Sequence, residues 1–439
     1  MGISQSLYTG VTGLATQSDG MSVIANNIAN ANAKGFKRDR AEFEDMLSTD
    51  MATGGGAAQI GRGARMRDVR TMHTQGGLQV TDNLTDLAIQ GQGFFVLGNA
   101  NTEVQESAGK FYTRVGSFIF DKDGFLADPS GGRVQGFMTN KSGMLTTKLE
   151  DFKIDTNAIP PTATGNVKLD LNLDARAKFI EGEFDVNNPD LTSNFSNGIT
   201  VFDSQGRSHQ MTVYFKKGEE STDGQQWTWF ATVDGKEVTD SSGPIHQIGS
   251  GTLRFDNLGN LMEQEAEDTE VNFAGGALPG QRLKFDFGKI LTDEGFGKGG
   301  STTAIASKSV TNFHSQDGFE SGNIKSIRIE LDGSVRGIYT NGIQRHLGTL
   351  AMATFENQDG LLKAGRNLFY STMDSGPPKI GVPQSGTRGS IYASTLEESN
   401  VDLAGEFVNM ILTQRAFQAN SRSITTTDTM IEEVINLKR

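Results

Sequence analysis

Residues 3–28 read ISQSLYTGVTGLATQSDGMSVIANNI, and an apolar side chain returns at every seventh position along this stretch. The apolar positions are Leu7, Leu14, Met21 and Ile28, with Ile24 on the adjoining row. A strict period of seven predicts a helix with a narrow apolar seam, which is typical of coiled-coil packing. We expect this helix to cover residues 1–33 and to stop at Lys34-Gly35, because glycine suits the left-handed position after a helix end.

The other end of the chain repeats the same period. Its apolar positions are Leu403, Met410, Phe417, Ile424 and Ile431. Residues 399–402 supply N-cap side chains, and Lys438-Arg439 suits the negative end of the helix dipole. Neither helix should be stable alone, because each interior glycine, such as Gly10 or Gly13, costs about 1 kcal/mol relative to alanine. The two helices are therefore predicted to be stable only when they pack against each other and against neighbouring copies. The alternative is an ordinary helix pair that caps one domain.

Between the two ends the apolar period changes to two, which predicts β-strands. Residues 112–120, 210–215 and 326–331 each alternate in this way. Residues 120–124, 202–206 and 255–259 share the form F-D-x-x-G, in which aspartate and glycine occupy the first and fourth positions of a type I turn. Asp332-Gly333 predicts a two-residue hairpin loop. The middle of the chain is therefore expected to form short antiparallel strands in barrels or sandwiches.

A shift in composition divides this middle part. Both tryptophans, Trp227 and Trp229, lie between Pro160-Pro161 and the glycine-rich segment 295–300. We predict a multidomain α+β chain with a coiled-coil-like terminal domain and two nested all-β domains. The predicted segments are the N-terminal axial helix and connector (1–70), two halves of an inner β domain (71–150 and 318–390), an inserted outer β domain (151–317) and a C-terminal axial helix (391–439).

Length and charge limit the possible functions. The 439 residues suggest two to four domains, and the net charge of −13 argues against a general nucleic-acid binder. The basic segment 34–40 is short, so it is expected to be solvated or paired with an acidic neighbour. No apolar run is long enough for a membrane span, and the N-terminus lacks the features of a cleaved signal peptide. The chain has no cysteine, which excludes thiol catalysis and disulfides.

We predict no catalytic residue, no cofactor and no metal site. Residues 295–300 satisfy G-x-G-x-x-G, but the segment that follows is a poor helix and the chain lacks βαβ alternation. The five histidines show no H-x-x-x-H spacing. Residues 121–124 (DKDG) lack the downstream glutamate that a calcium loop requires.

Residues 26–37, NNIANANAKGFK, resemble the signature of the bacterial flagellar rod and hook axial proteins, with alanine at residue 33 where the family usually has threonine. The signature positions are Asn26, Asn27, Ala29, Asn30, Gly35 and Phe36. Residues 84–95, 112–120, 132–136, 398–403 and 414–421 match further family motifs. Residues 197–203, 212–215 and 315–324 resemble the insertion found in the hook members of the family.

The resemblance implies a structural protein that polymerises with many copies of itself into a curved tube, with its terminal helices inside. It also implies contacts with the distal rod protein, the hook-capping protein and the hook–filament junction proteins, and export by the flagellar type III apparatus to the extracellular part of the flagellum. The asparagines near residues 26–32 are expected to form hydrogen bonds across the helix packing between copies. The alternatives are a rod-type axial protein, a secreted carbohydrate-binding β protein, and a nucleotide-dependent enzyme built on residues 295–300.

Overall fold

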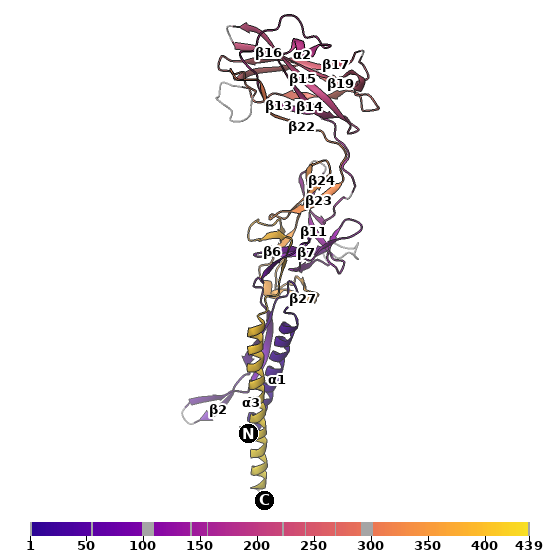
Figure 1. Cartoon of the computed structure of the whole chain (residues 1–439). Coiled ribbons are helices and arrows are strands. Elements are labelled where there is room, and N and C mark those ends of the chain that lie inside the picture. Colours follow the sequence, from indigo (N-terminus) through magenta and orange to yellow (C-terminus); the bar gives the residue numbers. More distant parts are fainter. Residues whose placement is uncertain are drawn as a thin grey trace. The chain divides into compact units, whose positions relative to one another are not determined.

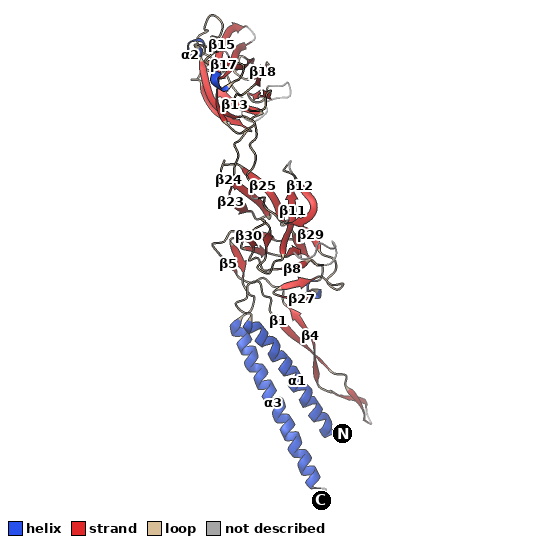
Figure 2. Ribbon diagram, turned by 90° about the vertical axis from the view of Figure 1, so that its right-hand side faces the viewer, coloured by secondary structure: helices blue, strands red, loops and turns tan. Residues whose placement is uncertain are grey.

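The chain is mostly β, with a long helix near each end (Figures 1 and 2). A computed structural model describes residues 2–53, 56–98, 109–140, 143–155, 157–221, 224–241, 243–267, 269–290 and 302–437. The chain forms two compact units. Unit 1 comprises residues 1–155, 326–338 and 344–439, and unit 2 comprises residues 156–325 and 339–343.

The two long helices, α1 (Gly2–Ala29) and α3 (Leu403–Asn436), pack side by side in unit 1 (Figure 2). Helix α3 begins as predicted, because the Asp402 side chain accepts a hydrogen bond from the Ala404 amide at 3.1 Å. Helix α1 ends four residues before the predicted boundary. After Asn30 the backbone bonds change to the tighter three-residue spacing, because the Ala31 amide donates to the Ile28 carbonyl at 3.2 Å and the Ala33 amide to the Asn30 carbonyl at 3.1 Å. Gly35 is left-handed as expected, with φ +67°, whereas Lys438-Arg439 lies outside the described residues.

The connector after α1 folds back along it as a β-hairpin. Its strands are β1 (Asp39–Asp45) and β4 (Ala64–Thr71), which pair antiparallel, and a second hairpin of β2 (Thr49–Thr53) and β3 (Gly56–Ile60) lies between them in the sequence. Close to α1, a side chain at Gly20 would meet the Phe43 ring, because a Cβ there would lie 3.2 Å from Phe43 Cζ.

A long sheet follows the hairpin. Its main path is β23 (Ile324–Ile329), β24 (Ser334–Tyr339), β25 (Gln344–Leu350), β11 (Arg133–Thr139), β7 (Phe94–Gly98), β8 (Phe111–Thr113), β28 (Leu368–Tyr370) and β27 (Leu362–Gly365). Strands attached to this path are β9 (Ile119–Phe120), β10 (Leu126–Ala127), β12 (Leu145–Asp151), β26 (Met352–Thr354) and β29 (Lys379–Gly381). Two short pairs join distant segments, β6 (Leu87–Gln90) with β30 (Ser390–Ala393) and β5 (Leu78–Val80) with β31 (Thr395–Glu397). A short 3₁₀ turn, η2, covers Gln358–Gly360.

Two strand predictions in this region need correction. Residues 112–120 form two short strands, β8 and β9, because the backbone between them bonds to another segment: the Leu87 amide donates to the Gly116 carbonyl at 2.9 Å. The loop at Asp332-Gly333 is one residue longer than predicted, since Glu330 and Ser334 form its closing hydrogen bond.

Unit 2 is built on a five-stranded antiparallel sheet. Its order is β14 (Phe195–Phe202), β15 (Ser208–Ser221), β16 (Gly224–Asp234), β17 (Ile245–Phe255) and β18 (Leu261–Ala266). The other strands are β21 (Lys284–Asp286), β13 (Asn166–Asn172) and β22 (Val310–Gln316) in one sheet and β19 (Glu270–Val271) with β20 (Gln281–Arg282), and the short helices are α2 (Pro189–Thr192) and η1 (Gly235–Glu237). Trp227 and Trp229, two residues apart on β16, are fully buried in the unit 2 core.

The three F-D-x-x-G turns form as predicted. In each, the aspartate side chain accepts amide hydrogen bonds from residues two and four positions later, at 2.7–2.9 Å. The glycines at 124, 206 and 259 all have φ between +82° and +84°. This repeated geometry requires glycine at the fourth position.

Candidate assembly surface

The predicted apolar seam residues divide into two groups in unit 1. Those that are half-buried are Leu7, Leu14, Met21, Ile24 and Ile28 on α1, and Met410, Ile424 and Ile431 on α3. Leu403 and Phe417 remain exposed, at 42% and 43% of their surface. The helix pair within one chain therefore leaves part of the predicted seam of α3 uncovered.

The close approach of α1 and α3 depends on glycine. A Cβ at Gly10 would lie 2.8 Å from Ile424 Cγ1, and one at Gly13 would lie 2.6 Å from Asn420 Nδ2. These glycines, which the sequence suggested only as a cost to the helix, leave room for the partner helix. The signal was present in the sequence, since a glycine pair on one helix face is typical of close helix contact.

Replacing Gly10 with valine is expected to separate the two helices. The added side chain would overlap Ile424, and overpacking of this kind costs about 1–3 kcal/mol. Amide hydrogen exchange of α1 and α3 in the assembled protein should speed up. Ala15→Val, on the exposed outer face of α1, is the matched control and should have little effect. Equal exchange rates in the two variants would contradict the glycine contact.

Apolar side chains cover much of the outer surface of α3. Those that are exposed are Leu403, Phe407, Val408, Ile411, Leu412, Phe417, Met430, Val434, Ile435 and Leu437, and Tyr8 and Val11 are exposed on α1. Exposed apolar side chains in this number on one pair of helices indicate an interaction site. The helix pair is therefore the strongest candidate for a contact with other molecules.

The side chains of the signature asparagines Asn26, Asn27 and Asn30 form hydrogen bonds within the chain. Asn27 is buried, donates to the Asp39 carbonyl at 2.7 Å and accepts from the Asp39 amide at 2.8 Å. It also donates to Glu406 Oε2 at 3.3 Å, so one amide joins α1, β1 and α3. The Asn27 amide is thus already used inside one chain, and the expected bonds between copies stay a prediction for the signature asparagines. Asn26 and Asn30 bond to each other, and Ala29 is the exposed last residue of α1.

Gly35 and Phe36 pack where the chain enters the β part of unit 1. The Gly35 amide donates to the Glu397 carbonyl at 2.7 Å, and a Cβ at Gly35 would lie 2.9 Å from Val115 Cγ2. Phe36 is 7% exposed, and the Lys363 ammonium lies 5.5 Å from its ring centre. These two signature residues therefore fix the start of the connector.

A buried charge cluster ties both ends of the chain together at this point. Lys37 Nζ lies 2.5 Å from Glu397 Oε1, and Arg114 Nη1 lies 3.5 Å from Glu397 Oε2. The three side chains are at most 3% exposed. Lys37 also donates to the Thr74 carbonyl at 2.8 Å, and the Gly76 amide donates to Glu397 at 2.9 Å. Burial lowers the pKa of both Lys37 and Arg114, and the Glu397 carboxylate opposes this shift.

The basic segment 34–40 is paired with acidic side chains, which confirms the expectation of acidic neighbours. Besides the Lys37 pair, Lys34 lies 3.5 Å from Glu398, Arg38 lies 3.9 Å from Glu406, and Arg40 lies 2.7 Å from Glu42. Each cation therefore has an acidic partner in the same chain.

His73 lies beside the charge cluster in an aromatic setting. Its ring centre is 5.8 Å from that of Phe94 and 5.7 Å from that of Phe369. Burial lowers the pKa of His73 from 6.5 to about 4, the Asp359 carboxylate opposes the shift, and the cations Lys37, Arg114 and Lys363 add to it. The imidazole is therefore neutral at pH 7.

Unit 1 is expected to lose stability as the pH falls from about 6.5 to about 4. Within this window the unfolded chain binds a proton at residue 73 that the folded chain does not, so acid favours unfolding. The loss from His73 is roughly 2–3 kcal/mol and is complete near pH 4. Unfolding free energy measured against pH should fall less steeply for His73→Leu than for the unchanged protein. Parallel curves would contradict the assignment.

Among the described residues no group of three or more His, Asp or Glu side chains is placed to hold a metal ion. No helix in the described part of the chain is long and apolar enough to span a membrane. The G-x-G-x-x-G segment at 295–300 lies outside the described residues.

Four family models match the chain. They are the flagella basal body rod protein (residues 7–37), the flagellar hook protein FlgE/F/G D1 domain (88–170), the flagellar basal body protein FlaE D2 domain (172–319) and the flagellar basal body rod FlgEFG protein C-terminal segment (393–437). The matches at residues 7–37 and 393–437 include the exposed apolar residues of α1 and α3.

Curated relatives match along nearly the full chain. The flagellar hook protein FlgE of Treponema pallidum is 33% identical over 99% of this chain and 100% of its own length. That of Escherichia coli K12 is 30% identical over 98% of each chain. The crystal structure of Helicobacter pylori flagellar hook protein FlgE2 shares the fold, with a TM-score of 0.52 at 16% identity over 72% of this chain and 100% of that one.

Proposed function

Because the chain belongs to the flagellar hook protein family, we propose that it is the structural subunit of the flagellar hook. In this role it polymerises into a curved, flexible tube that joins the basal-body rod to the filament in bacterial motility. The observation that carries the proposal is the helix pair α1–α3, which leaves a large apolar surface uncovered in a single chain.

The terminal helices are proposed to form the inner, coiled-coil-like part of the polymer. The seam residues Leu403 and Phe417, exposed in one chain, are then covered by neighbouring copies. The inner β domain (71–150 and 318–390) and the inserted outer domain (151–317) lie outside this tube and slide past their neighbours. Axial stiffness from helix packing combined with sliding outer domains gives a joint that bends yet transmits torque.

The proposed protein partners follow from a position between the basal-body rod and the filament. We propose contacts with the distal rod protein, the hook-capping protein and the hook–filament junction proteins, after export through the flagellar type III apparatus to the extracellular side. Neither nucleic acid nor membrane insertion has a place in this role, and the protein is not an enzyme. The paired state of Lys34, Lys37, Arg38 and Arg40 supports the absence of nucleic acid binding.

Electron microscopy of polymer grown from the purified full-length chain tests the function. A curved tube is the expected result. A straight rigid rod would favour a rod-type axial protein, and glycan binding without self-assembly would favour a carbohydrate-binding protein. Measurable nucleotide affinity would be needed for the enzyme alternative.

A further inference from the structure

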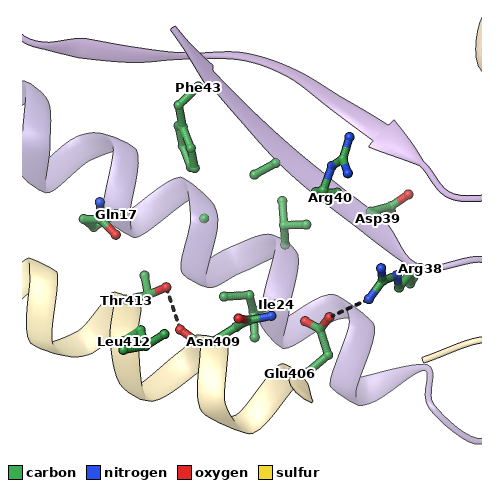
Figure 3. A pocket seen from close by; sticks show the side chains of 13 residues that line it. Gln17, Ile24, Arg38, Asp39, Arg40, Phe43, Glu406, Asn409, Leu412 and Thr413 are labelled. Atoms are coloured by element: carbon green, nitrogen blue, oxygen red, sulfur yellow. Dashed lines mark hydrogen bonds and ion pairs between the residues drawn. The ribbon is translucent and has the colours of Figure 1, made fainter. Parts of the chain in front are cut away.

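An open groove of about 390 Å³ lies between α1, β1 and α3 (Figure 3). Its apolar lining consists of Val23, Ile24, Ala41, Phe43 and Leu412. Phe43 and Leu412 are exposed at 46% and 57% of their surface, so the groove is not filled by its own chain. Gly20 also lines it and adds no side chain beneath the Phe43 ring.

The charges at the rim of the groove are already paired. Arg38 lies 3.9 Å from Glu406, and Arg40 lies 2.7 Å from Glu42. The Lys363 ammonium forms an ion pair with the Asp39 carboxylate, with Nζ 2.6 Å from Oδ1. Since these charged side chains are satisfied within the chain, the groove is suited to an apolar occupant and not to an ionic ligand. Its volume is at the low end for binding pockets, which fits one or two side chains.

The same chain carries an apolar stripe that faces away from the groove. Leu403, Phe407 and Ile411 are spaced by four residues, so they share one face of α3, and they are exposed at 42%, 51% and 50%. At about 100° per residue, Leu403 and the groove residue Leu412 lie about 180° apart around the helix. The stripe of one chain therefore faces away from the groove of that chain.

We propose that Phe407 in the α3 stripe of one copy inserts into the α1–β1–α3 groove of a second copy. The inference rests on the hook function proposed above and names the contact that drives growth. A contact between two different patches on opposite sides of a helix is heterologous, and such contacts build open helical polymers when the rotation does not close. Because each copy carries a net charge of −13, association needs apolar contacts that offset the repulsion.

Cysteine cross-linking tests the pairing directly, because the natural chain has no cysteine. Full-length Phe407→Cys/Leu412→Cys is assembled and oxidised, then resolved on a denaturing gel. The two thiols point about 140° apart on one helix and do not meet within a chain. We expect a ladder of covalent multimers from the double variant and no ladder from either single variant. A normal polymer without the ladder would overturn the pairing and leave the hook function standing.

A second variant keeps the inference testable if the double variant does not assemble. Phe407→Asp is expected to raise the critical concentration for assembly at least about 100-fold, because it places a carboxylate in the groove. Leu191→Asp makes the same kind of change at a residue of unit 2 that is 79% exposed, and should leave assembly unchanged. Unchanged assembly of Phe407→Asp would overturn the inference. Failure of the unsubstituted chain to polymerise would instead count against the proposed function.

Discussion

Replacing Glu397 with alanine is expected to lower the free energy of unfolding of unit 1 by about 3–5 kcal/mol, which is typical when one partner of a buried ion pair is removed. Lys37 and Arg114 would then remain buried without the carboxylate that balances them. The loss should affect both ends of the chain, because Glu397 lies just before α3 and Lys37 follows α1. Denaturant unfolding followed by amide exchange of strands β6 and β7 measures the effect.

The chain offers two controls for this experiment. Glu398→Ala removes a neighbouring carboxylate whose side chain is 50% exposed and 3.5 Å from Lys34, and it should cost about 1 kcal/mol or less. The two tryptophans lie in unit 2, so their fluorescence reports on a unit that Glu397→Ala leaves intact. Equal losses from Glu397→Ala and Glu398→Ala would show that the buried cluster does not hold unit 1 together.

Replacing Phe417 with aspartate is expected to stop polymerisation while both β parts stay folded. Phe417 is 43% exposed in one chain, so the monomer accepts the change. In the polymer the new carboxylate would be buried without a partner, at a cost of several kcal/mol. A cost of about 3 kcal/mol raises the critical concentration about 100-fold. Leu14→Asp should act in the same direction, but Leu14 is half-buried within one chain, so its effect includes damage to packing inside unit 1.

Sedimentation of the assembled protein against concentration measures the effect of Phe417→Asp. Thr426→Asp is the matched control, since it adds the same charge to an exposed polar position of α3. The control should polymerise at close to the normal concentration. If Phe417→Asp also polymerises normally, α3 does not pack against neighbouring copies through this residue.

The elements that the sequence predicts well are those set by local patterns. The period of seven locates α1 and α3, Asp402 caps α3, and the aspartates of the three F-D-x-x-G turns bind nearby amides. Each of these features depends on residues within a few positions of one another. The end of α1 differs from the prediction because the backbone bonds change to a three-residue spacing from Ala31 onward, and the period of seven does not reveal that change.

The residues that sequence reasoning missed depend on contacts between distant segments. Glu397 meets Lys37 across 360 positions, and nothing near either residue predicts that partner. Arg114 looked like one residue of a strand, although its guanidinium is buried in the cluster. Gly10 and Gly13 are predicted only to weaken α1, because the room they leave for α3 becomes visible only when the two helices are packed together.

Hydrogen exchange on residues 2–29 and 403–436, compared between monomer and polymer, tests the central claim most directly. The claim is that the helical ends become stable only when many copies pack together. The account predicts fast exchange of both segments in the free monomer and strong protection in the polymer. Strong protection of both segments in a monomer that does not polymerise would contradict it.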